Sequence, residues 1–417
     1  MDLDDLSIDE SRIGRELSRL AEFSAAPAPA VTRVLFSPED LAARAYLSDL
    51  AAEAGLTVRT DAVGNLFMRW EGSQPDLPAV ATGSHCDAIP HSGQYDGTVG
   101  VLGGLEAIRA LQRCGSAPRR SIELVMFTAE EPTRYGIGCL GSRLLAGVLE
   151  PAAADALKDA EGTTLAQLRA TAGCTGELAS VELASGHYHR FVELHIEQGP
   201  LLERDGVDIG AVTAIAAPAA LRVKYGGPGG HAGAVLMVDR RDPLLPAARL
   251  ALAVDRAARE SGAPDTVATV GVMDVHPRAI NSIPREVTLE IDVRDIDGPR
   301  RDAVLEQIDA SAEQYGNDAR CMTAIEVLNA DPPATCDKTI VAAIEAAAAA
   351  AGLSCQRMIS RAYHDSLFMS LAAPTAMIFI PCREGISHRP EEFAAPSAMA
   401  GGVEVLARTL WQLASEK

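Results

Sequence analysis

Lysine is scarce in this chain, and long apolar runs and closely paired cysteines are missing from it. Only four lysines occur, and none follows a glycine, so there is no G-K-[ST] loop and no nucleotide hydrolysis of that type. No stretch approaches the roughly 18 uninterrupted apolar residues of a membrane-spanning helix. The eight cysteines form no C-x-x-C pair, which in a chain of 417 residues indicates reduced, mostly buried thiols rather than a disulfide framework or a zinc knuckle.

The composition is that of an acidic globular protein. The chain has 37 basic and 57 acidic residues, a net charge of −20, which disfavours nucleic acid as a partner. Its hydrophobic content of 47% is typical of folded proteins, and its length suggests two or three domains. The first residues are acidic and lead into no apolar run, unlike a signal peptide. We therefore expect a soluble, cytoplasmic protein that binds neither nucleic acid nor membranes.

The pattern of apolar residues predicts an α/β fold with an insertion. Short apolar runs bounded by breakers alternate with helical spacing, which implies βαβ units and a mainly parallel sheet. Between about residues 213 and 329 the order changes to strand-helix-strand-strand-helix-strand, the ferredoxin-like pattern. We predict a mainly parallel-sheet catalytic domain formed by residues 1–212 and 330–417, interrupted by a ferredoxin-like lid and dimerisation domain of residues 213–329.

Histidines and carboxylates follow four separate predicted strands. Because the carboxyl ends of parallel strands meet at one edge of a sheet, these side chains should lie together. They are His85, Asp87 and Asp96 after the first strand, Glu130 and Glu131 after the second, His195 after the third and His388 after the last.

This set of residue types favours a metal site. A single histidine after a strand is more often a polar loop residue than a ligand, and Glu-Glu pairs are usually solvated. Because all four strand ends carry ligand-type residues, a metal site is the better interpretation. Mixed imidazole and carboxylate ligands suit Zn²⁺, Mn²⁺ or Co²⁺, and one carboxylate can bridge two such ions.

Four motifs carry a family resemblance that spans almost the whole chain. They are Gly83-Ser-His-Cys-Asp87, Asp96-Gly97, Thr128-Ala-Glu-Glu-Pro132 and Leu194-His-Ile-Glu-Gln-Gly-Pro200. In this order they resemble the carbamoylase and allantoate amidohydrolase branch of the dinuclear M20 metallopeptidase superfamily. The resemblance implies two divalent ions per subunit, with Mn²⁺ favoured over Zn²⁺, Co²⁺ or Ni²⁺.

The resemblance also implies roles for these residues. Asp96 would bridge both metals, with His85 and His195 completing one site and Glu131 and His388 the other. Asp87 would orient His85, and Glu130 would be the general base. In the inserted domain, His231 would reach across a homodimer to stabilise the oxyanion. By the resemblance, substrate contacts would come from Gln198, Asn281 and Arg294, and we also expect Tyr363 and His364 to contact the substrate.

One position departs from the wider branch. Carbamoylases and allantoate amidohydrolases carry a glycine before the pair His364-Asp365, whereas this chain has Tyr363. The stretch from residue 359 to residue 369 resembles ureidoglycolate amidohydrolases instead. The implied activity is hydrolysis of (S)-ureidoglycolate to glyoxylate, ammonia and CO₂ in allantoin and purine catabolism. The alternatives are allantoate or an N-carbamoyl-L-amino acid as substrate, and a non-catalytic binding module of the same fold.

Overall fold

The computed structural model describes residue 3 and residues 5–416. The chain forms two compact units. The larger unit consists of Met1–Thr213, Thr335–Ser360 and His364–Lys417, and the smaller unit consists of Ala214–Ala334 and Arg361–Tyr363. The sequence pattern placed the boundaries near residues 212 and 330, and it did not indicate that residues 361–363 return to the smaller unit.

The larger unit is built on one sheet, in the order β15-β8-β17-β7-β4-β6-β3-β2, with β16 paired to β8. Its strands are β2 (Thr57–Thr60), β3 (Leu66–Trp70), β4 (Ala79–His85), β6 (Ile122–Phe127), β7 (Tyr188–Ile196), β8 (Ile209–Ile215), β15 (Ala334–Thr335), β16 (Cys355–Ser360) and β17 (Thr375–Ile380). A separate pair joins β1 (Val31–Arg33) to β5 (Ala88–Ser92).

The sheet is mixed, with parallel strands at its centre. Strands β17, β7, β4 and β6 run parallel, whereas β8 and β3 run antiparallel to their neighbours β17 and β6. The connection between β2 and β3 is too short for a crossover, so these two strands pair antiparallel. The α/β class expected from the sequence is confirmed. The antiparallel flanks are what the sequence pattern did not indicate.

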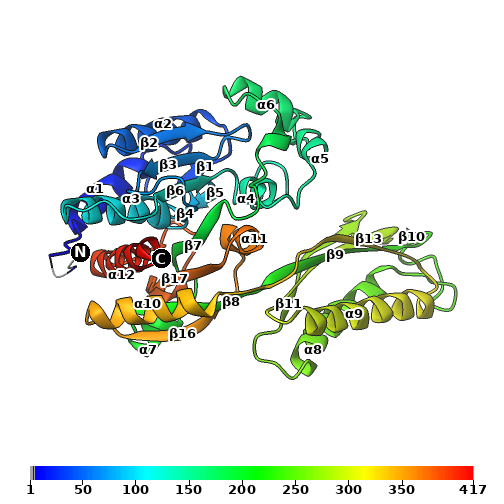
Figure 1. Cartoon of the computed structure of the whole chain (residues 1–417). Coiled ribbons are helices and arrows are strands. Elements are labelled where there is room, and N and C mark those ends of the chain that lie inside the picture. The colour runs from blue at the N-terminus through cyan, green and yellow to red at the C-terminus, as the bar shows by residue number, and fades with distance from the viewer. Residues whose placement is uncertain (1–2, 4, 417) are drawn as a thin grey trace. The chain divides into compact units, whose positions relative to one another are not determined.

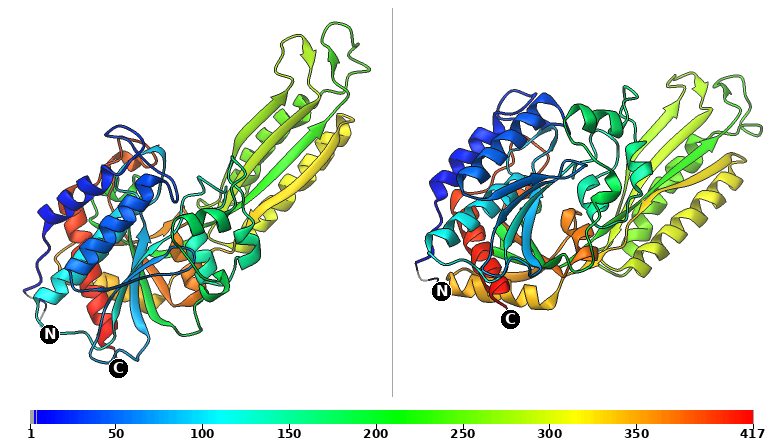
Figure 2. Two further views of the ribbon diagram at one scale, coloured as in Figure 1. Left: turned by 90° about the horizontal axis from the view of Figure 1, so that it is seen from above. Right: turned by 45° about the horizontal axis from the view of Figure 1, so that its top comes forward.

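Helices cover the sheet of the larger unit. Helices α1 (Glu10–Ala21), α3 (Thr98–Arg113) and α12 (Pro396–Ser415) pack together against it (Figure 2). The other helices of the unit are α2 (Pro38–Glu53), α4 (Leu140–Leu145), α5 (Pro151–Asp155), α6 (Leu165–Thr171), α7 (Leu201–Asp205), α10 (Lys338–Ala350) and α11 (Asp365–Ala372), with 3₁₀ turns η1 (Leu178–Ser180) and η2 (Arg383–Gly385). Ser37 caps α2, where it accepts a hydrogen bond from the backbone N–H of Asp40.

The smaller unit is an antiparallel sheet with helices on one face (Figure 1). Its long elements follow the order β9 (Ala217–Gly226), α8 (Leu244–Glu260), β11 (Val267–His276), β13 (Glu286–Asp295), α9 (Gly298–Asp318) and β14 (Met322–Ala330). The sheet order is β11-β13-β9-β14, and short strands β10 (Gly230–His231) and β12 (Ser282–Ile283) pair at one end. Alternate residues of β13, such as Val287, Leu289 and Ile291, point into the core, as the two-residue period of a strand requires.

Candidate metal centre

The predicted ligands converge at the carboxyl ends of the parallel strands. His85 ends β4, Glu130 and Glu131 follow β6, and His195 lies near the end of β7. Asp96 immediately precedes the turn into α3, where Gly97 has a φ of 65°. A Cβ atom at Gly97 would lie 2.5 Å from the His85 ring, so only glycine lets this turn approach the imidazole.

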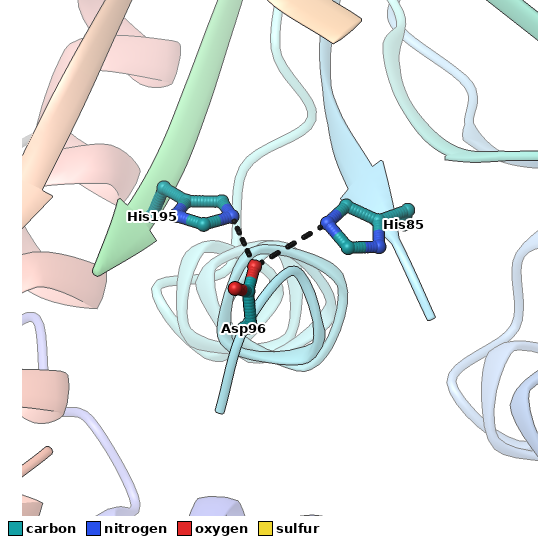
Figure 3. Close-up of side chains that lie close together, drawn as sticks. All are labelled: His85, Asp96 and His195. Carbon is teal, nitrogen blue, oxygen red and sulfur yellow. Dashed lines mark ion pairs between the residues drawn. The ribbon is translucent and has the colours of Figure 1, made fainter. Parts of the chain in front are cut away.

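Asp96 lies at the centre of the cluster, with different histidines at its two oxygens. Its Oδ1 atom lies 3.5 Å from Nε2 of His85 and 3.2 Å from Nε2 of His195 (Figure 3). Its Oδ2 atom lies 3.3 Å from Nε2 of His388, which is also 3.3 Å from Oε1 of Glu131. The residues therefore form two ligand groups that share Asp96, namely His85–Asp96–His195 and Asp96–Glu131–His388.

Main-chain carbonyls orient two of the histidines. Nδ1 of His85 lies 3.1 Å from the carbonyl oxygen of Asp87, and Nδ1 of His195 lies 2.8 Å from that of Ile196. Each Nδ1–H can therefore donate to a carbonyl, which leaves Nε2 facing Asp96. The backbone N–H of Gly97 donates to Nε2 of His195, as expected for a nitrogen that carries a lone pair. A lone pair facing a carboxylate at this distance needs a proton or a cation between them.

Asp87 holds the loop that carries the two glutamates. Its buried carboxylate accepts hydrogen bonds from the backbone N–H groups of Glu130 (3.3 Å) and Glu131 (3.0 Å). The same carboxylate is 3.6 Å from Nδ1 of His85, beyond hydrogen-bonding distance. The carboxylate thus contacts the Glu130–Glu131 loop more closely than the histidine that the resemblance implied.

The carboxylates of the cluster repel one another strongly in the absence of a cation. Burial raises the pKa of Glu130 well above its ordinary value, and the charges of Glu131, Asp365 and Asp96 add to this shift. Burial also raises the pKa of Glu131. Burial alone would raise the pKa of Asp96, but hydrogen bonds with His195, His388 and His85 hold it well below its ordinary value.

The donor set fits two divalent ions. Imidazole nitrogens and carboxylate oxygens are present in each group, and their atoms lie within 4.8 Å of one another. Gln198 lies beside the cluster, where its Nε2 donates to Asp96 at 2.6 Å and its Oε1 atom is buried without a hydrogen-bond partner among the described residues. An unpartnered acceptor beside the cluster suits a ligand with a donor group.

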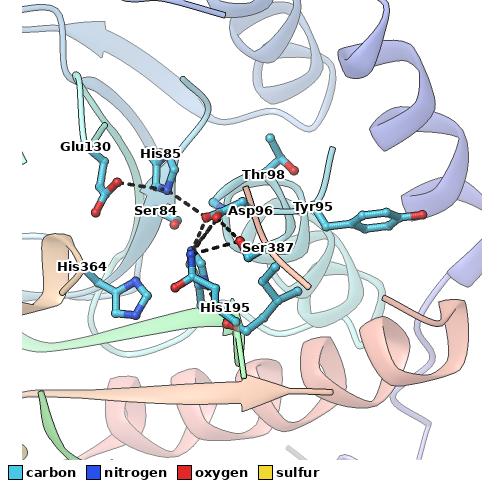
Figure 4. A network of polar contacts seen from close by, with 12 residues as sticks. Ser84, His85, Tyr95, Asp96, Thr98, Glu130, His195, His364 and Ser387 are labelled. Carbon is cyan, nitrogen blue, oxygen red and sulfur yellow. Dashed lines mark hydrogen bonds and ion pairs between the residues drawn. The ribbon is translucent and has the colours of Figure 1, made fainter. Parts of the chain in front are cut away.

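A third group of ligand-type atoms, around Glu193, is occupied by the protein itself. Glu193 accepts hydrogen bonds from Ser84 and from both the backbone and the hydroxyl of Ser366. His364 is buried beside His195, with ring centres 4.5 Å apart (Figure 4). Its Nε2 lies 3.0 Å from the hydroxyl of Ser360. Both carboxylate oxygens of Glu193 therefore accept hydrogen bonds from the protein, and His364 packs against the predicted metal ligand His195.

The remaining predicted residues lie in the smaller unit, in two separate pairs. His231 pairs with Ser282 in the β10–β12 ladder, and Asn281 directly precedes Ser282. The side chains of His231 and Asn281 are both exposed. Arg294 lies near the other end of β13, where it pairs with Asp292 and places its guanidinium carbon 5.9 Å from the ring centre of Tyr363. At about 3.3 Å per residue, the ten residues of β13 separate the two pairs by roughly 30 Å.

Three residues that contact the cluster were missed from the sequence. The hydroxyl of Ser387 donates to Oδ2 of Asp96 at 2.7 Å. Glu392 hydrogen-bonds the backbone of Tyr95 and Asp96, and the thiol of Cys139 donates to Glu130 at 3.6 Å. Cys139 lies on the loop after Glu131 and offers no local signal. Glu392 belongs to a second Glu-Glu pair, Glu391-Glu392, four residues after His388, and that pair is a signal that could have been used.

Comparison with known proteins identifies the family. Residues 81–412 match the model of the Peptidase family M20/M25/M40. The chain belongs to this family. It is 53% identical over 417 residues to a ureidoglycolate hydrolase of Arabidopsis thaliana, covering 98% of this chain and 87% of that protein. An N-carbamoyl-L-amino acid amidohydrolase of Geobacillus stearothermophilus is 37% identical over 408 residues, covering 98% and 99%.

A solved structure agrees with this assignment. The crystal structure of AtUAH in complex with (S)-hydroxyglycine has a TM-score of 0.91 and 52% identity, covering 99% of both chains, and AtUAH has also been solved with glyoxylate. The family and its relatives make this chain a hydrolase that acts on C–N bonds and binds divalent metal. Among the described residues, no helix is long and apolar enough to cross a membrane.

Proposed function

We propose that this M20 hydrolase converts (S)-ureidoglycolate and one water into glyoxylate, two ammonia and CO₂. The observation that carries the proposal is identity over nearly the whole chain. The sequence identity is 53% with a ureidoglycolate hydrolase and 37% with an N-carbamoyl-L-amino acid amidohydrolase. The neighbour at 52% identity was crystallised with (S)-hydroxyglycine and with glyoxylate, which match the second half of this reaction.

In this proposal, five residues hold two divalent ions, with Mn²⁺ favoured. Asp96 would be shared by the two ions, His85 and His195 would hold one of them, and Glu131 and His388 would hold the other. Bound divalent ions polarise a carbonyl and lower the pKa of water. Asp87 keeps Glu130 and Glu131 in place through their backbone N–H groups.

Glu130 acts as the general base and then as the proton donor to the leaving amine. Its carboxylate lies 3.6 Å from Nε2 of His85 and has no place in either ligand group, so it stays available for proton transfer. Water attacks the ureido carbon, the C–N bond breaks, and ammonia leaves with the proton that Glu130 returns. Loss of CO₂ then gives hydroxyglycine, whose amino group leaves as the second ammonia of the reaction to form glyoxylate.

We further propose that the active unit is a homodimer. Asn281 and Arg294 are both expected to contact one compact substrate, yet Arg294 lies near the end of β13 and Asn281 lies just before β12, beyond the start of β13. One chain cannot bring both to the same molecule, whereas a second chain can supply His231 and Asn281. The edge strand β11 exposes Val272 and Met273, and an exposed apolar edge strand is a natural pairing surface.

A substrate panel tests the proposed function. Full-length protein reconstituted with Mn²⁺ is incubated with (S)-ureidoglycolate, allantoate and an N-carbamoyl-L-amino acid, and ammonia and glyoxylate are both measured. We expect two ammonia per glyoxylate from ureidoglycolate, and a kcat/KM at least 100-fold above those of the other substrates.

Glu130→Gln is the matched control for this panel, because the amide has nearly the same shape but cannot act as a base. It should keep its metals and lose several orders of magnitude in kcat. Faster turnover of allantoate or of the carbamoyl amino acid would replace the proposed substrate. Metal-loaded protein without turnover on any of the three would favour the binding module.

A further inference from the structure

Glu392 is a buried carboxylate that contacts the loop carrying Asp96 and belongs to neither ligand group. Its side chain is 4% exposed, and its Oε1 accepts hydrogen bonds from the backbone N–H groups of Tyr95 (2.8 Å) and Asp96 (3.0 Å). Its Oε2 lies 3.0 Å from the hydroxyl of Ser387. That hydroxyl is also 2.7 Å from Oδ2 of Asp96 (Figure 4).

These contacts join the two ligand groups. The backbone bonds fix the peptide that leads into Asp96, and therefore the direction of its Cα–Cβ bond. Ser387 precedes His388 in the chain, so its contact with Glu392 ties the loop of the second group to the same carboxylate. A ligand set keeps its metal tightly only when the surrounding hydrogen bonds hold the ligands in place.

The local sequence leaves room for this arrangement. A Cβ atom at Gly93 would lie 2.3 Å from Cβ of Glu392, so glycine lets the loop before Asp96 close over the carboxylate. Asp87 makes a similar contact, since it also accepts hydrogen bonds from two consecutive backbone N–H groups, those of Glu130 and Glu131, although it uses one oxygen for each. Two buried carboxylates outside the ligand set thus each hold one ligand-bearing loop.

We propose that Glu392 is a positioning residue of the metal centre, which sets the place of Asp96 directly and of His388 through Ser387. This inference rests on the proposed function, because it assumes that Asp96 and His388 bind metal. A role only in stabilising the loop would lower the melting temperature without changing the affinity for metal once the protein is folded.

The test is a Mn²⁺ titration of metal-free, full-length protein by calorimetry, with bound metal counted and the apo melting temperature recorded. Glu392→Ala removes every contact. Glu392→Gln keeps an oxygen for the two backbone N–H groups and loses the charge. Asp337→Ala is the matched control, because Asp337 likewise accepts two backbone N–H bonds, from Thr339 and Ile340, at the start of α10.

We expect Glu392→Ala to bind Mn²⁺ about 10–100-fold more weakly than wild type, with Glu392→Gln clearly less affected and Asp337→Ala unchanged. If Glu392→Ala does not fold, Ser387→Ala should still weaken Mn²⁺ binding relative to Asp337→Ala. Wild-type affinity in the Glu392 variants would overturn the inference, and equal losses in Ala and Gln would show that charge rather than positioning is responsible. Wild-type protein that binds no Mn²⁺ would instead contradict the proposed function.

Discussion

Asp87→Asn separates two explanations of how Asp87 supports the metal centre. In the structure, Oδ1 and Oδ2 each accept one backbone N–H, from Glu130 at 3.3 Å and from Glu131 at 3.0 Å. Asparagine keeps one acceptor and turns an NH₂ group towards the other N–H. One charge-assisted bond is lost and one buried donor is left unpaired, at a cost of about 1–3 kcal/mol.

The loss of metal affinity should be confined to one of the two ligand groups. The hydrogen bond from His85 goes to the main-chain carbonyl of residue 87, which the substitution leaves intact. We therefore expect weaker binding at the Glu131–His388 site, by about 5–150-fold, and a lower kcat because Glu130 moves. The His85–His195 site should keep its affinity.

The assay is a two-site Mn²⁺ titration of metal-free wild type, Asp87→Asn and the control Asp337→Asn, with kcat measured at saturating metal. Weakening confined to the His85–His195 site would show that the carboxylate acts across the 3.6 Å gap to His85. Unchanged binding and kcat would refute both explanations.

Three further predictions concern pH, substrate contact and assembly. In the metal-free protein, burial raises the pKa of Glu392 to about 7, and hydrogen bonds with its carboxylate neighbours raise that of His388 to about 10. Both groups bind protons more tightly in the folded state, so their stabilisation is complete below the ordinary values of 4.5 and 6.5 and is lost as pH rises through about 7 and 10. The apo melting temperature should therefore fall from pH 5 to pH 9, and Mn²⁺ should raise it more at pH 8 than at pH 5; a flat apo profile would contradict this. Tyr363→Phe keeps the ring beside Arg294 and removes only the hydroxyl. We expect kcat/KM for ureidoglycolate to fall by an amount equivalent to about 1–3 kcal/mol, because the hydroxyl is expected to make a hydrogen bond to the substrate. Wild-type kinetics in this variant would exclude that hydrogen bond. Mixing His231→Ala with Glu130→Gln subunits should restore part of the activity in heterodimers, and no recovery after confirmed subunit exchange would mean that each site is built from one chain.

Much of the fold could be predicted from local patterns of apolar residues in the sequence. Buried strands such as β4, β6 and β17 are short apolar runs between breakers, and helix α3 shows its spacing at Leu102, Leu105 and Ile108. Helix α1 also has a local pattern, since Ile13, Leu17 and Leu20 follow a helical period and Asp9 caps it. The antiparallel flanks of the sheet depend on pairing between distant segments, which a local pattern does not encode.

The candidate site divides in the same way. His85, Asp96, Glu130, Glu131 and His195 could be predicted because each follows or closely precedes a recognisable element. The pair Glu391-Glu392 is visible in the sequence, but only the structure shows that Glu392 accepts hydrogen bonds from the backbone of Tyr95 and Asp96, almost 300 residues away. The separation of Asn281 from Arg294 follows from the structure, where Asn281 lies before β12 and Arg294 lies near the far end of the extended strand β13.

The metal content of two variants tests the central claim that Asp96 joins two ions in one centre. Wild type, Asp96→Ala and Glu131→Ala are loaded with Mn²⁺, freed of excess metal and measured by elemental analysis per chain. The account predicts two ions in wild type, none in Asp96→Ala and about one in Glu131→Ala. Two tightly bound ions in Asp96→Ala, with its fold intact, would contradict it.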